Sequence, residues 1–597
     1  MRRDYWVDWL TPAHARQAAR LESKVHPRSY RAGYSSILED LRDADASGSN
    51  LSVGLFLGSR LVGFLLAFHE TERSRICQYI DVKPPEGIDL SGPGIYLNDF
   101  VVHPGHRGAG AMLAARLAQV VRVRDDLRTL PLDTFSTDTM TETWSAKVRF
   151  LRRMGVEVSE QTPLQIEARA DALFWIVFRP MQAEARHEKK VPALGSRLKR
   201  RETFSLDDRT FDIGVITSVS DWARLRPYWN DLLGRTSGST VFQSYEYLTT
   251  WWSLLGLRNE LLIAVVLRDD VPVAIAPMQI SRAQSLGCDR RCLSFIGHPS
   301  EVDRNTLLLD EAAEPLVDRI ARYLVSCEEL WDFAALYEQP PESPLLKVLV
   351  DLLTAKKYFV TGVSGPECAT VRIAGTWNDF LAAKPKSFRK SIQRRLSKIA
   401  AAGDSVLDSL QSPDADQAEV ALGRYCAIEA ASWKRSAALG VAKSSSHRSF
   451  YTQIVRTFAA SGATTFQFLR MNGKDASGTF GLHWARTFYS LHIAHDESFA
   501  EHSPGVALTA LELKSAFENG KMATFDFLGG FMTNKSGWAT TLSPSVAVFA
   551  HRRNVNGWLF HWIHFRMRPR VRRALIRFQL LETARAAQQF LKKIGAR

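Results

Sequence analysis

Apolar and polar positions follow the same order at three places along the chain. Each place begins with two runs of alternating apolar residues joined by a short polar turn, which is the pattern of a β-hairpin. The hairpins are predicted at residues 51–68, 260–280 and 464–485, with turns at Gly58-Ser59, Asp269-Asp270 and Asn472-Gly473. Such repetition indicates repeated structural modules instead of one continuous core.

A strand, a helix and a second strand are predicted after each hairpin. They fall at 95–102, 111–123 and 130–135 in the first copy, at 293–296, 315–327 and 331–337 in the second, and at 488–496, 506–520 and 523–530 in the third. Elements in this order form the core of a mixed α/β sheet, in which a junction between strand and helix faces a ligand. The sequence therefore predicts an α/β protein with three mixed-sheet modules.

The chain has 597 residues, which is several times the usual length of one domain, about 100–200 residues. Ala183–Phe204 is charged, is interrupted by Pro and Gly, and lacks apolar periodicity, so we expect a linker there. We expect Gln411–Gln417 to be a loop within the last module. The predicted division is a first module at 1–182, a linker at 183–204, a paired unit with halves at 205–370 and 371–550, and a tail at 551–597.

Composition narrows the class of protein. Hydrophobic residues make up 45% of the chain and charged residues 23%, which is typical of an ordinary folded protein. The six cysteines form no CxxC pair and no zinc-binding spacing, so we predict reduced thiols and no metal site. No apolar run reaches the ~18 residues of a membrane-spanning helix, and the N-terminal residues lack the pattern of a secretory signal. We therefore expect a cytoplasmic protein.

A glycine-rich turn links a strand to a helix in the first module, in the segment VVHPGHRGAGAMLAARL that starts at Val101. Backbone N–H groups at a helix start are unpaired and carry the positive end of the helix dipole, so they favour phosphate. Gly108 and Gly110 remove side chains, which lets a pyrophosphate approach the main chain, and Arg107 adds positive charge. The segment predicts a phosphate-binding turn; a glycine turn that only caps the helix is the alternative.

This segment resembles the acetyl-CoA loop of the GNAT N-acetyltransferase family, which reads Arg/Gln-x-x-Gly-x-Gly/Ala after a strand. Arg107 and Gly110 match, and Met112 stands at the last position. The resemblance implies that acetyl-CoA or another acyl-CoA is bound by Val101, Val102, Arg107, Gly108, Ala109, Gly110 and Ala111. It also places Asp99 at the position of a family general base. Leu151 replaces the tyrosine that the family uses as an acid, so cofactor binding without ordinary turnover stays open for this module.

Residues 212–541 resemble the CelD-type acetyltransferases of cellulose biosynthesis, which are related to the FemAB peptidoglycan-bridge transferases and pair two GNAT folds. The segments that carry the resemblance are TVFQSYEYLTTWW, KPKSFRKSIQRRLSKI, ASWKRSAALG and AHDESFAEHSPGVALTALELKSAFENGKMATFDFLGG. Members carry a Gly-Asp/Glu-x-Tyr-Lys run after the last strand; here GGFMTNKSGW keeps Lys535, to which the resemblance assigns substrate binding. The implied fold is one N-terminal GNAT module followed by a paired double-GNAT unit.

Seven Lys and Arg residues lie between positions 384 and 398 with no acid among them. A helix face without counter-charge suits phosphate or pyrophosphate, for example of CoA or of a lipid- or nucleotide-linked sugar. The residues predicted to bind it are Arg389, Lys390, Arg394 and Arg395. A solvated helix face is the alternative interpretation. Trp433 and Lys434 suit stacking on a sugar or an adenine ring, although a core tryptophan has the same pattern.

Ser503, Pro504 and Gly505 stand between a strand and a helix of the third module. Ser503 is predicted to cap this helix, and the helix start, including Gly505, is predicted to accept an anion. Asp496 closes the preceding strand and Asp526 lies in the next one, so either carboxylate can act as a base or bind the acceptor. A purely structural role is the alternative for each of these residues.

The net charge of +14 is concentrated near the C-terminus. Residues 551–597 contain 12 Lys and Arg residues and one acid, Glu582, together with Trp558 and Trp562. Aromatic residues beside cations are typical of a helix that lies on anionic lipid, so we expect this tail to contact a membrane surface. Nucleic acid is the less favoured partner because no recognised reading module accompanies the tail, and packing on the protein itself is a further alternative.

Taken together, these patterns predict an acyltransferase that moves acetyl or another acyl group from acyl-CoA to an amino or hydroxyl group. The expected acceptor is a cell-envelope sugar, a polysaccharide precursor or a similar small molecule. FemAB-like transfer of an aminoacyl group from charged tRNA is the alternative enzyme, and a non-catalytic GNAT scaffold at the membrane is the alternative outside enzymes. We expect the protein in the cytoplasm or at the inner face of the cell membrane. The oligomeric state stays open.

Overall fold

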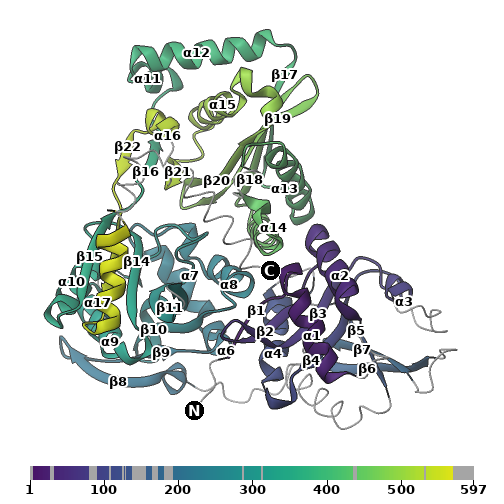
Figure 1. The fold of residues 1–597 in the computed structure, drawn as a ribbon. Helices are drawn as coiled ribbons and strands as arrows, with labels where there is room; N and C mark the ends of the chain where they lie inside the picture. Colours follow the sequence, from purple (N-terminus) through teal and green to yellow (C-terminus); the bar gives the residue numbers. More distant parts are fainter. Residues whose placement is uncertain are drawn as a thin grey trace. The chain divides into compact units, whose positions relative to one another are not determined.

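A computed structural model describes the chain as two compact units (Figure 1). The first unit comprises residues 1–191 with the short segments 252–258 and 444–449, and the second comprises the remainder. The residues described are 5–26, 32–79, 90–106, 109–123, 127, 130–137, 156–164, 173–180, 193–285, 288–310, 313–434, 440–529, 533–568 and 570. Arg107, Gly108 and Leu151 lie outside them, as does the tail from residue 571 onwards.

The first unit holds a seven-stranded mixed sheet. Its strands in spatial order are β1 (Tyr5–Trp9), β2 (Val53–Leu57), β3 (Arg60–Glu70), β4 (Gly94–Val102), β5 (Leu132–Thr137), β7 (Leu173–Pro180) and β6 (Val156–Leu164). Its helices are α1 (Ala15–Val25), α2 (Gly33–Ser47), α3 (Arg75–Tyr79) and α4 (Gly110–Val123). Apolar residues at helical spacing, such as Leu21 of α1 and Leu41 of α2, pack with Phe64 of β3 in one core. β4 and β5 run parallel and are joined through α4, as the sequence pattern predicts.

The first sheet of the second unit is also mixed. Its strands in spatial order are β15 (Phe359–Ser364), β23 (Val546–His551), β14 (Phe333–Gln339), β12 (Cys288–Phe295), β11 (Val271–Ser285), β10 (Glu260–Arg268), β9 (Arg209–Ile216) and β8 (Lys199–Leu206), and β13 (Leu308–Leu309) pairs with β11. The helices along this stretch of chain are α6 (Val219–Trp222), α7 (Arg226–Arg235), α8 (Tyr245–Leu254), α9 (Leu316–Ser326) and α10 (Pro344–Ala355). β12 and β14 run parallel and are joined through α9.

Residues 199–204, which the sequence places in a linker, form most of strand β8, so the linker interpretation is wrong for them. β8 pairs antiparallel with β9, and Phe204 stacks on Phe211 with ring centroids 5.5 Å apart. Most side chains of this edge strand are exposed, and several are charged. A strand with few buried positions lacks the apolar alternation by which strands are recognised in a sequence.

The second sheet of this unit carries the third module. Its strands in spatial order are β17 (Ser405–Gln411), β18 (Thr464–Met471), β19 (Lys474–Trp484), β20 (Thr487–His495), β21 (Thr524–Gly529), β16 (Cys368–Arg372) and β22 (Thr541–Ser543). The helices are α11 (Trp377–Ala382), α12 (Lys386–Ala401), α13 (Ala415–Ala430), α14 (Ser445–Ala459), α15 (Pro504–Asn519) and α16 (Thr533–Trp538), and α17 (Val555–Trp562) follows β23. β20 and β21 run parallel and are joined through α15.

The three predicted hairpins are confirmed as β2–β3, β10–β11 and β18–β19. Each is followed by a parallel strand pair that flanks a helix, so the predicted α/β fold with three mixed sheets is confirmed. Within the described residues, none of the helices combines the length and the apolar character needed to cross a membrane.

The two sheets of the second unit exchange strands. β16 directly follows β15 in the chain but lies between β21 and β22 of the other sheet, and β23 returns to lie between β14 and β15. The two crossing segments are bonded to each other: Gly365 donates its N–H to the carbonyl of Ser545 at 2.8 Å, and the Ser545 hydroxyl donates to the carbonyl of Pro366 at 2.7 Å. The expected boundary between residues 370 and 371 falls inside β16.

We predict that Gly365→Ala destabilises the second unit by roughly 1–3 kcal/mol, because a Cβ at this position overlaps the Ser545 hydroxyl. Gly362→Ala is the matched control, since a Cβ on this nearby β15 glycine meets nothing within 4 Å. Urea unfolding of both variants measures the difference. Equal stability of the two would show that the crossing segments tolerate a side chain and are not tightly packed.

Candidate functional site

The parallel strands of the third module separate towards their carboxyl ends. The described residues of β20 and β21 are paired at Thr487–Thr524, Phe488–Phe525 and Tyr489–Asp526 and at no later position. The facing edges of residues 490–495 and 527–529 therefore carry backbone groups that do not bond to each other. The short helix Glu497–His502 connects β20 to the N-terminus of α15. Carboxyl ends of parallel strands beside a helix N-terminus are a common place for anionic ligands.

Two lysines donate to carbonyl groups of these separated strands. Lys434 Nζ lies 2.7 Å from the Ile493 oxygen on β20, and Lys535 Nζ lies 2.7 Å from the Phe527 oxygen on β21. Burial lowers the pKa of both ammonium groups. For Lys434 the nearby carboxylate of Glu429 opposes this effect, and the positive charge of Lys535 adds to it. The site thus concentrates positive charge, close to where the two strands part, on groups that burial makes readier to release a proton.

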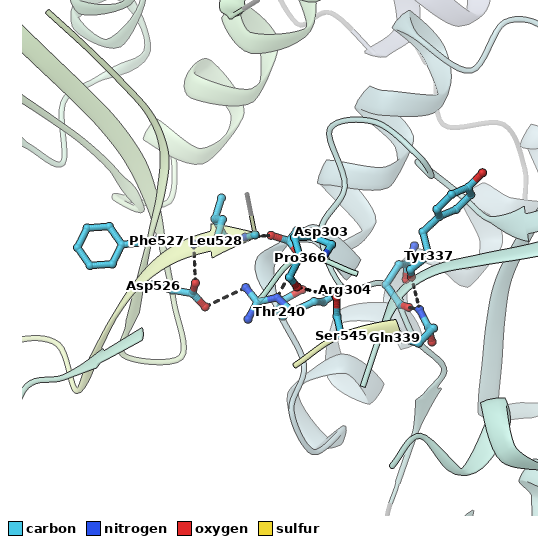
Figure 2. A network of polar contacts seen from close by, with 12 residues as sticks. Thr240, Asp303, Arg304, Tyr337, Gln339, Pro366, Asp526, Phe527, Leu528 and Ser545 are labelled. Carbon is cyan, nitrogen blue, oxygen red and sulfur yellow. Dashed lines mark hydrogen bonds and ion pairs between the residues drawn. The ribbon is translucent and has the colours of Figure 1, made fainter. Parts of the chain in front are cut away.

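Asp526, the residue before the Phe527 carbonyl that Lys535 contacts, forms a buried ion pair with Arg304, and Figure 2 shows this pair. Arg304 Nη2 lies 2.8 Å from Asp526 Oδ2, and the Asp526 side chain is nearly inaccessible to solvent. The second carboxylate oxygen of Asp526 accepts the Leu528 N–H at 2.8 Å. Burial raises the pKa of Asp526, and Arg304 opposes that effect. Arg304 comes from the loop after β12 and Asp526 from β21, so the pair joins the two sheets of the second unit.

Two further carboxyl groups complete this network. Asp303 accepts the Gly529 N–H at 3.1 Å and lies 3.2 Å from Arg304 Nε. Burial raises the pKa of Glu338, at the end of β14, to about 8, and the neighbouring carboxylate of Asp303 adds to the shift. Burial disfavours the positive charge of Arg304, but the carboxylates of Asp303 and Asp526 outweigh this effect and raise the pKa of Arg304. At neutral pH Glu338 therefore holds a proton, because two adjacent buried carboxylates do not both ionise easily.

The backbone around this network is strained. Glu301, Arg304, Glu338 and Leu528 have φ values of 66°, 51°, 51° and 62°, in the left-handed region that favours glycine. Such a conformation costs about 1–3 kcal/mol at a bulky residue and persists where the surrounding structure enforces it, most often at functional sites. Other residues in this region, such as Asp269 and Asn472, belong to hairpin turns, where it is ordinary. The gathering of strained residues therefore marks the network as a candidate site.

Residues 386–536 match the protein family described as an acetyltransferase (GNAT) domain. The matched segment includes β20, α15 and β21, together with Asp526 and Lys535. The chain contains a GNAT acetyltransferase domain. The resemblance of the third module to this family is thereby confirmed, and the enzyme class is that of the GNAT-family acyl-CoA-dependent transferases.

Several solved structures are similar to the chain. FemX is 11% identical over 57% of this chain and 98% of its own, with a TM-score of 0.40. A conserved protein of unknown function from Bacteroides thetaiotaomicron is 11% identical over 57% of this chain and 99% of its own, with a TM-score of 0.36. NAA60 of Arabidopsis thaliana, solved in complex with acetyl-CoA, is 11% identical over 30% of this chain and 99% of its own, with a TM-score of 0.22. No curated protein matches the chain.

The structure brings together two of the residues that the sequence singles out in the GNAT domain, Asp526 and Lys535. Asp526 is engaged through both of its oxygens, by Arg304 and by the Leu528 N–H, so it positions neighbouring groups. Asp303, Arg304 and Glu338 were missed by sequence reasoning. Asp303 and Arg304 lie in the irregular stretch after β12, where no periodicity indicates a site, and the charged sequence Glu301-Val302-Asp303-Arg304 was the available signal. Glu338 lies near the end of β14, where no sequence signal marks it.

The start of α15 differs from the sequence-based expectation. Ser503 occupies the N-cap position, but its backbone is left-handed, with φ 54°, and its side chain makes no capping hydrogen bond. The prediction that Ser503 caps the helix is therefore wrong, because this backbone turns the side chain away from a capping geometry. A Cβ on Gly505 would meet only His495, at 3.7 Å, so the first turn leaves room beside the end of β20.

Asp496 has a structural role in the GNAT domain. Its Oδ1 accepts the Ser498 N–H at 2.8 Å and so caps the short helix between β20 and α15. This hydrogen bond engages one of the two carboxylate oxygens. Its prediction as a catalytic group gains no support from this geometry.

The predicted phosphate-binding cations lie on α12, which packs on α15 through the buried residues Ile392 and Ile399. Arg389 and Arg395 donate to the nearby carbonyl groups of Ala382 and Ser391 within their own segment. Lys390 and Arg394 are exposed. Within the described part of the chain, no carboxylate forms an ion pair with these four cations, and no hydrogen bond joins them to Asp526 or Lys535. The helix thus carries a solvent-facing cationic surface.

The described site residues of the first module are engaged in packing and in local hydrogen bonds. Val101 is fully buried in the core, and the space that Gly110 leaves is taken by Phe100 and Val102, whose carbons would lie 3.1 and 3.0 Å from a Cβ. Gly110 therefore permits close packing of α4 on β4. Asp99 lies 3.2 Å from His26 Nε2 and accepts the Phe100 N–H at 2.7 Å. Ala109 and Ala111 adjoin Gly110 at the start of α4, and Arg107 and Gly108 lie outside the described residues.

We predict that Arg304→Met costs about 3 kcal/mol of stability, because it leaves the buried Asp526 carboxylate without its partner. Arg304→Met combined with Asp526→Asn should recover most of this loss. Arg235→Met is the control: Arg235 also pairs with two carboxylates, Asp231 and Asp310, but at the surface, where the loss should stay below about 1 kcal/mol. Urea unfolding provides the measurement. A similar small loss for Arg304→Met would refute a tightly coupled pair.

Glu338 makes the stability of the protein depend on pH. Its pKa is about 8 in the folded chain against an ordinary value of 4.5, so the folded state keeps a proton that the unfolded state releases. This contribution is complete below about pH 4.5 and is lost as the pH rises to about 8. Glu338→Gln mimics the protonated carboxyl and should remove the contribution, so that the variant gains stability relative to the native chain between pH 5 and 8. Urea unfolding measures the free energy of unfolding of both chains. If the difference between these free energies stayed constant over this range, the raised pKa would be contradicted.

Proposed function

We propose that the chain transfers an acyl group, acetyl in the first instance, from acyl-CoA to an amino or hydroxyl group of a small or sugar-linked acceptor. The observation that carries this proposal is the separation of β20 and β21 inside the matched GNAT domain, with Lys434 and Lys535 bonded to carbonyls of the separating strands. Separated strand edges offer backbone donors and acceptors to a ligand that itself contains amides, as the pantetheine arm of CoA does. The N-terminus of α15, with the space beside Gly505, suits its pyrophosphate.

The reaction has simple chemical requirements. The acceptor loses a proton and attacks the thioester carbon, the new bond to nitrogen or oxygen forms, and the carbon–sulfur bond breaks to release a thiolate. Lys535 fits two of these needs, because an ammonium group held near the reacting carbon can stabilise the negative charge on the thioester oxygen and can pass a proton to the thiolate. Its lowered pKa favours the proton transfer. The Arg304–Asp526 pair fixes β21, and with it the carbonyl that holds Lys535.

The acceptor class is proposed from the cationic surface of α12. Arg389, Lys390, Arg394 and Arg395 lie on one helix without an acidic partner among the described residues. Such a surface suits phosphate or pyrophosphate groups, and a sugar linked to a nucleotide or a lipid carrier presents both these groups and the hydroxyl or amino group to be acylated. A cell-envelope sugar or polysaccharide precursor is the acceptor that best combines these features.

We predict that the full chain binds acetyl-CoA and that Lys535→Met weakens this binding about tenfold or more, because a charge-assisted hydrogen bond is lost. Lys521→Met is the matched control, since Lys521 is an exposed lysine beyond the opposite end of α15. Calorimetric titration measures the affinities, and mass spectrometry of a panel of amino sugars and nucleotide sugars detects transfer. Absence of acyl-CoA binding by the native chain would reject the proposal in favour of a tRNA-dependent transferase or a scaffold.

A further inference from the structure

Helix α17 exposes apolar side chains instead of burying them. Val555, Trp558, Leu559 and Trp562 recur at the spacing of one helix face, and their exposed fractions are 79%, 51%, 38% and 38%. The two indole rings stack on each other with centroids 6.2 Å apart. A run of large apolar residues on one solvent-facing stripe marks an interaction surface, whereas single exposed apolar residues are ordinary.

The opposite face of α17 anchors it to the body of the second unit. Phe560 and Ile563 are buried, and Arg290 of β12 lies 4.3 Å from the centre of the Phe560 ring. His561 bonds with the Thr361 hydroxyl of β15 at 2.7 Å, and Asn554 caps the helix through the Gly557 N–H at 2.7 Å. Figure 1 shows α17 lying along the β14–β15 end of its sheet. The helix thus packs on the second unit through its inner face, and the apolar stripe on its outer face is held towards solvent.

Cations surround the stripe. Arg553 precedes it, and Arg566, Arg568 and Arg570 follow it, all of them exposed. The sequence from residue 527 to residue 581 contains no Asp or Glu, so no acid close in sequence offsets these charges. Tryptophan in company with arginine is typical of protein surfaces that lie at the boundary between lipid headgroups and acyl chains.

We propose that this surface, Val555, Trp558, Leu559, Trp562 and the flanking arginines, docks the protein on an anionic lipid bilayer. The indoles and the aliphatic side chains enter the interfacial layer, and the arginines contact lipid phosphates. A membrane fits better than nucleic acid, because Val555 and Leu559 offer nothing to a base or a phosphate and the two indoles stack on each other. The surface acts independently of acyl transfer and brings the GNAT domain to a bilayer.

The test is co-sedimentation of the full chain with vesicles of phosphatidylcholine alone or mixed equally with phosphatidylglycerol, without CoA. We expect the native chain to prefer the anionic vesicles, and Trp558→Ser with Trp562→Ser to weaken this binding by at least about tenfold. Arg566→Gln with Arg568→Gln should remove the preference for anionic lipid and leave a weak, salt-insensitive association. Val420→Ser on α13, where Val420 is 67% exposed, is the matched control and should bind like the native chain.

Thermal unfolding of each variant checks that the fold is kept, and the arginine variant tests the proposal even where the tryptophan variant is unstable. Equal binding of the native chain to both kinds of vesicle, or unchanged binding by the tryptophan variant, overturns the proposal. Light scattering detects a dimer and filter binding detects an RNA complex, the two other occupants considered for this surface. A dimer, or an RNA complex, that the tryptophan variant loses without any vesicle binding by the native chain would assign the surface to that partner and reject the membrane.

Discussion

The exchange of β16 and β23 between two sheets is the constraint on which the second unit depends. Each sheet is completed by a strand that the chain delivers from the other half, so neither sheet is whole without both. Backbone pairing in a sheet satisfies obligatory hydrogen-bonding groups, and a missing inner strand would leave two neighbouring edges unpaired. The bonded crossing segments around Gly365 and Ser545 therefore tie the halves together. This junction holds in place a site built from residues of both halves, Arg304 from one and Asp526 from the other.

The charged network at that junction, taken by itself, lowers the stability of the folded chain. Asp526 and Arg304 lose most of their water, Glu338 keeps a proton at neutral pH, and the backbone at Glu338 and Leu528 adopts a conformation that bulky residues avoid. A buried ion pair and strained backbone gain little stability by themselves. They fix the carbonyl edge of β21, and with it Lys535, next to the separating strands. The stability of the surrounding sheets is thus used to hold charge in a defined place, which is what acyl transfer requires.

Local patterns predict the elements of this protein well, because hairpins and amphipathic helices are specified by neighbouring residues. The strand exchange could not be predicted, since no apolar pattern in the sequence marks the short strand β16 or indicates which sheet accepts it. β8 was missed because most of its side chains are exposed and several are charged, so it lacks apolar alternation. Part of the site could be predicted and part could not. Asp526 and Lys535 belong to a segment that the sequence singles out, whereas Arg304 pairs with Asp526 from 222 positions away. Ser503 shows that a capping residue can stand in the right place with the wrong backbone.

The three modules use the same strand geometry differently. In the second module β12 and β14 pair at two positions and then separate, as β20 and β21 do in the third. There side chains of the same module bond to carbonyls beyond the pairing: Asn305 donates to the Ile296 carbonyl at 2.9 Å, and Gln339 donates to the Asn305 carbonyl at 2.8 Å. These bonds hold the loop that carries Arg304 towards β21. The place where the parallel strands separate therefore braces the Arg304 loop in the second module, whereas in the third module Lys434 and Lys535 contact the carbonyls of the separating strands.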